Sequence, residues 1–161
     1  MFKKIILTSF ILLLLMSCTS NQSVRGAFKH TIEKDNTVQK YTILSEDKNA
    51  KTGTIFYQSV GEVTTISLRV FKKYDGEWKL INTGSCDDRW NITSEEGKKN
   101  IYCGTLTDQK YVNVFIDNEK AKVIKIKNGN TKAWYYLSTN PNASIVAEQS
   151  DGKKEIWHQS K

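Results

Sequence analysis

The alternation of apolar and polar residues in short segments constrains the fold more than any other feature of the sequence. Apolar side chains occupy every second position in 66–70 and again in 112–116. Successive side chains of a strand point to opposite faces of a sheet, so this period of two indicates strands with one buried face. Segments of this kind recur at roughly 8–12-residue spacing with turn residues between them. The pattern predicts a mainly β fold, an antiparallel β-sandwich or an open barrel of about eight or nine short strands.

Turn residues mark the hairpins that join these strands. Tyr74–Glu77 contains Gly76, which suits a positive φ, and Asp117–Glu119 also turns the chain. Asn128-Gly129 is the strongest short hairpin signal in the sequence. The polar segment 83–100 has no regular pattern, and we expect it to be a long loop.

One short helix is expected near the N-terminus, over residues 23–34. Phe28 and Ile32 are four residues apart and share one face of a helix, and Ser23 can cap its first turn. Gly26 weakens this helix because glycine loses more backbone freedom on ordering than other residues.

The first 23 residues have a different pattern from the rest of the chain. Lys3 and Lys4 precede an apolar stretch at 5–16, and a polar run at 19–23 follows Cys18. Twelve helical residues measure about 18 Å, which is short against a hydrocarbon core of about 30 Å. A basic start and a short apolar core are typical of a secretory signal peptide. An ordinary signal peptide or an uncleaved anchor is the alternative, although the polar run argues against an uncleaved anchor.

Leu15-Met16-Ser17-Cys18 resembles the lipobox of bacterial lipoproteins, from which Met16 departs slightly. The resemblance implies cleavage before Cys18, a diacylglyceryl group on its thiol and an acyl chain on the new amino terminus. Two or more chains anchor a protein stably, whereas one gives only marginal binding. We therefore expect a signal peptide at 1–17, a lipidated tether at 18–24 and one β-rich domain at 25–161. The domain is expected on the extracytoplasmic face of the cell membrane.

A wider resemblance is to small, mostly uncharacterised exported proteins and lipoproteins of Bacillus-type Gram-positive bacteria. It rests on the order of segments such as GTIFYQS, VFKKYDGEWKLI, YCGTLTD and DGKKEIW within residues 27–157. Glu77 separates Gly76 from Trp78, a departure from the tighter Gly-Trp spacing of those proteins. The resemblance implies the fold and the compartment, and no catalytic residue can be carried over from it.

The charge of the chain bears on its partners. The formal net charge is +7, and removal of Lys3 and Lys4 with the signal peptide lowers it to about +5. A basic surface can favour anionic lipid headgroups or an anionic wall polymer. The alternative is that the scattered lysines are solvated turn and strand residues. No motif for nucleic-acid binding is present in the sequence, and we expect a monomer.

Cys86 and Cys103 remain once Cys18 carries lipid. A disulfide between them is permitted outside the cytoplasm and would stabilise the fold by about 3 kcal/mol. Two free buried thiols are the alternative. The chain has no CxxC motif and only two histidines, His30 and His158, so no metal site of the usual spacing is visible.

The sequence contains no clear catalytic constellation. Asp87-Asp88 and Glu95-Glu96 are paired carboxylates in the polar segment, where solvation is the simpler interpretation. His30 and His158 are expected at the surface rather than as general bases. No G-x-S-x-G elbow and no glycine-rich phosphate loop occurs, and no cofactor is implied.

Aromatic residues are the weak candidates for binding. Trp134, Tyr135 and Tyr136 are consecutive, so on a strand Tyr135 points away from its two neighbours. Core packing is the simpler interpretation of these rings, and an exposed platform at Trp134 and Tyr136 is the alternative. Trp90, in the polar segment, is the best candidate for an exposed contact.

These observations favour a lipid-anchored domain that binds another envelope component, a protein or a polymer, without catalysis. Two alternatives stay open. One is an envelope hydrolase whose site is assembled from residues distant in sequence. The other is an immunity or exclusion lipoprotein that protects its own cell.

Overall fold

The alternating segments form the strands of three antiparallel sheets. The computed structural model describes residues 21–60, 63–94, 99–126 and 130–159, with one helix and twelve strands among them. The expected mainly β fold with a single short helix is confirmed. The expected signal peptide at 1–17, Cys18 and the turn expected at Asn128-Gly129 lie outside the described residues.

The sheets contain four strands each, and every pairing within them is antiparallel. Sheet A has the order β1-β2-β3-β4, with bounds Lys40–Lys48, Thr52–Val60, Thr64–Tyr74 and Glu77–Ser85. Sheet B has the order β5-β6-β10-β9, with bounds Asn91–Thr93, Asn100–Leu106, Lys132–Ser138 and Lys122–Lys125. Sheet C has the order β12-β11-β7-β8, with bounds Lys154–His158, Ile145–Gln149, Tyr111–Ile116 and Glu119–Lys120.

The N-terminal helix, α2 (Val24–Ile32), begins where the sequence predicts. Ser23 is its N-cap, and the Ser23 hydroxyl accepts a hydrogen bond from the Gly26 amide at 2.9 Å. Such a cap satisfies one of the four amides that the first turn leaves without a partner. The face with Phe28 and Ile32 is buried against sheet A.

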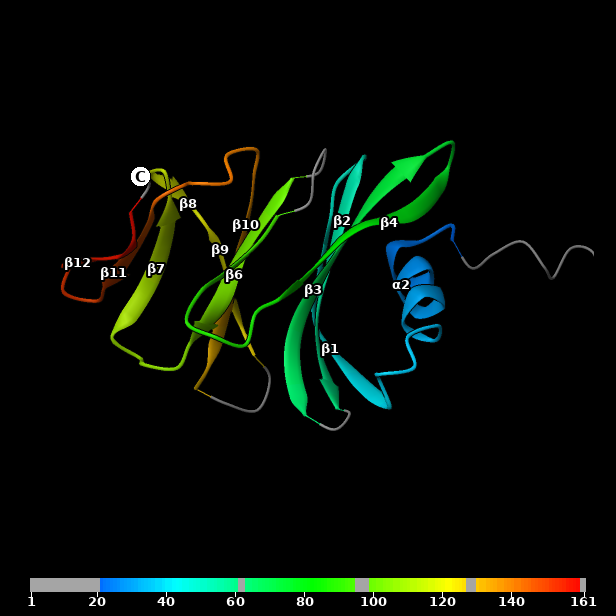
Figure 1. Cartoon of the computed structure of the whole chain (residues 1–161), viewed down its shortest axis with the longest axis horizontal. Coiled ribbons are helices and arrows are strands. Elements are labelled where there is room, and N and C mark those ends of the chain that lie inside the picture. The colour runs from blue at the N-terminus through cyan, green and yellow to red at the C-terminus, as the bar shows by residue number, and fades with distance from the viewer. Residues whose placement is uncertain (1–20, 61–62, 95–98, 127–129, 160–161) are drawn as a thin grey trace, which may run out of the picture.

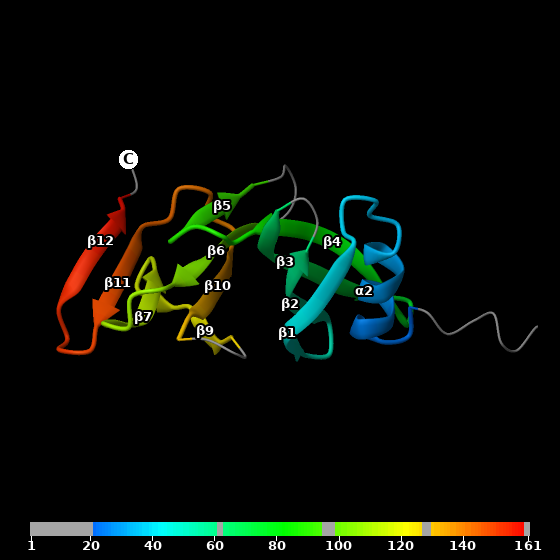
Figure 2. The same ribbon diagram turned by 90° about the horizontal axis from the view of Figure 1, so that it is seen from below.

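Helix α2 and the three sheets form a stack of four layers in the order α2, sheet A, sheet B, sheet C (Figures 1 and 2). Three apolar clusters fill the spaces between the layers. Phe28 packs with Phe71 between α2 and sheet A, and Leu68 packs with Tyr135 between sheets A and B. Tyr102 packs with Val114 and Ile145 between sheets B and C. Sheet B is therefore buried on both faces.

The twelve strands of the described residues exceed the eight or nine predicted, and two of the additional strands are too short to carry a signal of their own. β5 has three residues and β8 has two, too few to show alternation. The expected long loop at 83–100 is wrong in extent. β4 continues to Ser85, β5 lies within the segment, and β6 begins at Asn100.

Two hairpins turn through residues with positive φ, as their sequences predict. Asp75 and Gly76 join β3 to β4 with φ of 48° and 87°. Asp117 and Asn118 join β7 to β8 with φ of 47° and 70°. Consecutive positive φ values match the right-handed twist of the paired strands.

No helix in the described part of the chain combines the length and the hydropathy that crossing a bilayer requires.

Candidate binding site

The loop from Cys86 to Trp90, which follows β4, is fixed to sheet B by a disulfide. Cys86 is bonded to Cys103 on β6, with 5.2 Å between their Cα atoms. Both residues are fully buried between sheets A and B. The structure therefore contains the disulfide expected from the sequence, and it fixes the first residue of the loop.

Hydrogen bonds hold the next residues of the loop. The Thr105 amide donates to the Asp88 carbonyl at 2.8 Å, and its hydroxyl lies 3.1 Å from the Asp87 carbonyl. The Trp134 indole N–H donates to the Arg89 carbonyl at 3.1 Å. These carbonyls lie against the sheet, so the loop cannot move without breaking several bonds at once.

Gly104 is the residue that lets the loop approach β6 so closely. A Cβ atom at this position would lie 2.2 Å from the Arg89 carbonyl oxygen and 2.8 Å from the Asp88 carbonyl oxygen. Both contacts are far inside van der Waals distance, and both are to backbone atoms that have no freedom to rotate away. A glycine is therefore required here by close approach of two backbones.

The Asp87 carboxylate is used to hold the loop. It accepts a short hydrogen bond from the Ile66 amide and a second from the Ser85 hydroxyl at 3.0 Å. Both of its oxygens therefore have protein partners. Asp87-Asp88 is thus not a pair of equivalent groups, because the Asp88 side chain makes no hydrogen bond or ion pair to any other described residue.

A cleft of about 210 Å³ opens beside this loop, between the ends of sheets B and C. We call residues 86–90, which the disulfide and the hydrogen bonds hold in place, the pinned loop. The pinned loop forms one wall of the cleft, and the end of β6 with the residues that follow it forms another. The lining residues that carry charge or aromatic rings are Asp87, Asp88, Arg89, Asp108, Tyr111 and Trp157. Three carboxylates and one guanidinium line the cleft, and the Lys110 ammonium lies 3.5 Å from an Asp108 oxygen. Asp88 is therefore the lining carboxylate that has no side-chain partner among the described residues.

Aromatic rings form the inner wall of the cleft. Tyr111 meets Trp157 edge to face, with 5.2 Å between their centroids. The Arg89 guanidinium carbon lies 5.3 Å from the Trp157 ring centroid, over the ring. Trp157 in turn packs beside the buried Trp134. Because Arg89 covers the Trp157 ring, the cleft offers aromatic edges rather than a free flat face for stacking.

Glu155 joins Arg89 and Tyr111 across the strands. The Arg89 guanidinium lies 3.4 Å from one Glu155 oxygen, and the Tyr111 hydroxyl donates a short hydrogen bond to the other. The bond from Tyr111 and the charge of Arg89 both lower the pKa of the Glu155 carboxyl. Arg89 and Glu155 therefore form a partly exposed charged pair beside the cleft, and the same Arg89 side chain lies over Trp157.

The aromatic residues that the sequence suggested for binding differ in their burial. Trp134 is fully buried, so the suggestion that it forms an exposed platform is wrong. Tyr136 is half-buried on the same core between sheets B and C, and Tyr135 points to the opposite core, as strand geometry predicts. Trp90 is half-buried at the end of the pinned loop, with its ring 5.1 Å from that of His158.

The other candidate groups of the sequence lie apart. His30 is exposed on α2, and the His158 ring packs against Trp90 at a tilt of 43°. Neither histidine lines any of the three cavities identified in the described structure. Glu95 and Glu96 lie outside the described residues. Within the described ranges no three Cys, His, Asp or Glu side chains are grouped to hold a metal ion.

Sequence reasoning missed Arg89, Tyr111 and Trp157 as site residues. Tyr111 directly precedes the alternating segment 112–116, and Trp157 ends the segment DGKKEIW, so neither has a context that marks it as a site residue. They meet because β7 and β12 both pair with β11 in sheet C. No local pattern in the sequence carries that pairing.

The chain matches no protein-family model, no curated protein and no solved structure. Function is therefore inferred from the residues and the geometry of the site.

Proposed function

We propose that this chain is a lipid-anchored lipoprotein on the extracytoplasmic face of the cell membrane. Its β domain binds another envelope component and does not catalyse a reaction. The lipobox-like segment that ends at Cys18 supports the anchor. The disulfide between Cys86 and Cys103 supports an oxidising compartment, since disulfides persist outside the cytoplasm.

The single observation that carries the binding role is the pinned loop 86–90. A disulfide, the hydrogen bonds of Thr105 and the close approach of Gly104 fix it before any partner arrives. A fixed loop loses little conformational freedom on binding, which is the general advantage of a preorganised site. Among the described residues, those that line its cleft include no histidine, cysteine or lysine that could act as a base or nucleophile beside the carboxylates.

The charge of the cleft favours a cationic group on the partner. Asp88 lines the cleft without a side-chain partner among the described residues, whereas Asp108 pairs with Lys110 at 3.5 Å. Tyr111 and Trp157 line the same cleft. Ring edges carry the positive end of the quadrupole, so the carboxylates supply the attraction for a cation. A basic segment of an envelope protein therefore fits this site better than an anionic wall polymer does.

Strand β4 sets the distance between the anchor and the site. The backbone amide of Trp78, at the start of β4, donates to the carbonyl of Asn21, the first described residue. The pinned loop begins at Cys86, directly after the last residue of the same strand. Eight strand residues span about 26 Å, so β4 holds the cleft well away from a lipid at Cys18.

The anchor is tested by growth with a fatty-acid analogue that can be labelled after extraction. We expect the wild-type protein to carry the label and to fractionate with membranes, and the Cys18→Ala variant to lose both. Mass spectrometry of the N-terminal peptide gives the mass of the modification directly. Equal labelling of both proteins would show that Cys18 is not the attachment site.

The binding role is tested by photo-crosslinking in intact cells. A photoreactive amino acid is placed at Thr107, which lines the cleft, and, as a matched control, at Thr42 on β1. Both residues are exposed threonines, but Thr42 belongs to sheet A and Thr107 follows β6 of sheet B. We expect a discrete crosslinked protein from position 107 only. The same products from both positions, or none from position 107, would count against a partner at the cleft.

A further inference from the structure

The start of the described chain is bound to the hairpin that joins β3 to β4. The Trp78 amide donates to the Asn21 carbonyl at 2.9 Å. Figures 1 and 2 show the first described residues beside α2 and this hairpin, at the end of the stack away from sheet C. The β3–β4 hairpin is therefore fixed relative to the point where the tether enters the domain.

The sequence leaves little length between this point and the proposed anchor. Only Thr19 and Ser20 separate Cys18 from Asn21. Three residue steps span at most about 11 Å, even when fully extended. This step rests on the proposed function, because it takes Cys18 as the lipidated residue. With lipid at Cys18, the β3–β4 hairpin lies within reach of the phospholipid headgroups.

Lysines gather at this end of sheet A. Lys72 pairs with Lys79 across the β3–β4 hairpin, and the Lys73 amide donates to the Lys51 carbonyl in the neighbouring β1–β2 turn. All four side chains are exposed, and so is Lys48 at the end of β1. The acidic residues of the hairpin itself are Asp75 and Glu77. Lysines thus outnumber carboxylates by five to two over residues 48–52 and 72–79.

The same hairpin exposes two large side chains, Tyr74 on the face toward sheet B and Leu80 on the face toward α2. Tyr74 is 42% exposed and Leu80 is 38% exposed. Tyr74 has the Lys72 ammonium 5.1 Å from its ring centroid. Tyrosine is enriched at the level of the headgroups because its ring is apolar and its hydroxyl is polar.

We propose that this surface, formed by Lys48, Lys51, Lys72, Lys73, Lys79, Tyr74 and Leu80, rests on anionic phospholipid headgroups. We call it the tether-end surface. Lysines close to an anionic bilayer are attracted by its surface potential, and the attraction decays within a Debye length of about 8–10 Å. The short tether keeps these lysines inside that range. The contact orients the domain so that β4 projects away from the bilayer and the cleft faces outward.

The test uses the intact lipoprotein, purified from membranes and reconstituted into vesicles. One set of vesicles contains phosphatidylcholine with about one third phosphatidylglycerol, and the other contains phosphatidylcholine alone. A membrane-impermeant reagent then acylates accessible lysines, and mass spectrometry reports the rate at each position. We expect Lys72, Lys73 and Lys79 to react at least about threefold more slowly on the anionic vesicles than on the neutral ones. Lys120, Lys153 and Lys154 on sheet C should react equally on both.

Two charge-matched variants locate the effect. The variant K72E/K73E/K79E reverses three charges on the tether-end surface, and K120E/K153E/K154E reverses three on sheet C. Both change the net charge equally, so only the position of the charges differs. We expect the first variant to abolish the lipid-dependent protection of Lys51 and the second to preserve it. Protection lost equally in both variants would show that overall charge, and not this surface, is responsible.

Mass spectrometry of the Cys18 peptide in each preparation separates the two hypotheses. An unmodified Cys18 would overturn the proposed anchor and this inference with it. A lipidated Cys18 together with equal reactivity of the hairpin and sheet C lysines on anionic vesicles would overturn this inference alone. High salt should remove the protection, because it screens the attraction between lysines and headgroups.

Discussion

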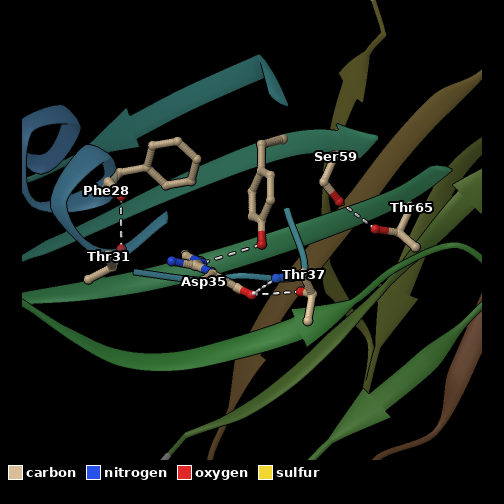
Figure 3. Close-up of polar contacts among 8 residues, drawn as sticks. Phe28, Thr31, Asp35, Thr37, Ser59 and Thr65 are labelled. Atoms are coloured by element: carbon tan, nitrogen blue, oxygen red, sulfur yellow. Dashed lines mark hydrogen bonds and ion pairs between the residues drawn. The ribbon is translucent and has the colours of Figure 1, made fainter. Parts of the chain in front are cut away.

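Arg69 and Asp35 form an ion pair that joins the turn after α2 to the middle of sheet A. The Arg69 guanidinium lies 2.7 Å from an Asp35 oxygen, and the Arg69 side chain is only 5% exposed. Arg69 also donates to the Tyr57 hydroxyl at 3.3 Å and lies 5.9 Å from the Phe28 ring centroid. Figure 3 shows the Asp35 carboxylate directed at Thr37, with which it forms a hydrogen bond. The pair therefore holds the C-terminal end of α2 against the sheet.

Removing the carboxylate should destabilise the protein strongly. Asp35→Ala leaves the Arg69 charge buried without its partner, which costs 3–5 kcal/mol in fully buried pairs. Asp35 is partly exposed, so we expect a loss of about 2–3 kcal/mol in the free energy of unfolding, measured with urea. The control is Glu33→Ala, which removes the exposed pair with Lys29 and should change stability by less than about 0.5 kcal/mol. Equal losses in the two variants would contradict the role of the buried pair.

The lowered pKa of Asp35 predicts that the free energy of unfolding depends on pH in the acid range. Hydrogen bonds from Thr37, together with the charge of Arg69, lower the pKa of Asp35 below its ordinary value. A carboxyl with a lowered folded pKa contributes stability above its ordinary pKa, and this contribution is lost as the pH falls through the lowered value. We expect the free energy of unfolding to fall between about pH 5 and pH 3. Asp35→Asn should fall less steeply over this range, and an identical slope would show that Asp35 does not contribute.

The disulfide between Cys86 and Cys103 should raise the free energy of unfolding. Closing the loop between Cys86 and Cys103 is worth about 3 kcal/mol in the chain-entropy model. We expect the Cys86→Ala/Cys103→Ala variant to lose about this much in urea unfolding. A reducing agent should lower the melting temperature of the wild type toward that of the variant and leave the variant unchanged. A wild type that is insensitive to reduction after unfolding and refolding in the reductant would argue against a bonded pair.

Much of sheet A and the hairpins could be predicted because their signals are local. Ile66, Leu68 and Val70 alternate within one strand, and Gly76 marks the turn that follows. Ser23 and Phe28 likewise define a cap and a face within one helix. Each of these signals depends only on residues a few positions apart.

The layered arrangement could not be predicted in the same way. All seven residues of β6 are buried, because sheet B lies between two other sheets. Its sequence, NIYCGTL, is not a continuous apolar run, since Asn100 and Thr105 are polar. Their burial is made possible by specific partners, such as the loop carbonyls that Thr105 binds. Such long-range partners leave no period in the sequence.

The candidate site could be predicted from the sequence only in part, because it too depends on contacts between residues far apart in the chain. Asp87, Asp88 and Trp90 were noted because they are conspicuous in a polar segment. Tyr111 and Glu155 are 44 positions apart and meet across sheet C, and neither has a distinctive sequence context. The carboxylates, the aromatic rings and the pinned loop form one site only when β7 and β12 are both paired with β11 in sheet C.

Tyr135 connects sheet B to sheet A through its hydroxyl, which makes it a probe of that interface. The hydroxyl lies 2.9 Å from the Thr54 hydroxyl on β2 and 3.2 Å from an Asp47 oxygen on β1. Burial raises the pKa of Tyr135 to about 12. The neutral phenol is therefore favoured in the folded protein relative to the unfolded chain.

This shift predicts a loss of stability in alkali. A tyrosine whose folded pKa is raised contributes stability that is fully present below the ordinary pKa of about 10 and is lost as the pH rises toward 12. We expect the free energy of unfolding of the wild type to fall over this range. Tyr135→Phe should cost about 1 kcal/mol near neutral pH, because Thr54 and Asp47 lose a partner. That variant should then fall less steeply between pH 10 and pH 12.

Tyr41→Phe is the matched control, because Tyr41 is 38% exposed and makes no side-chain hydrogen bond to another described residue. It removes the same atom from a ring that packs on Phe28 at the outer face of sheet A. We expect its alkaline transition, followed by circular dichroism, to coincide with that of the wild type. Coincident transitions in all three proteins would mean that the Tyr135 hydroxyl titrates as it does in water, and that sheets A and B do not exclude solvent at this point.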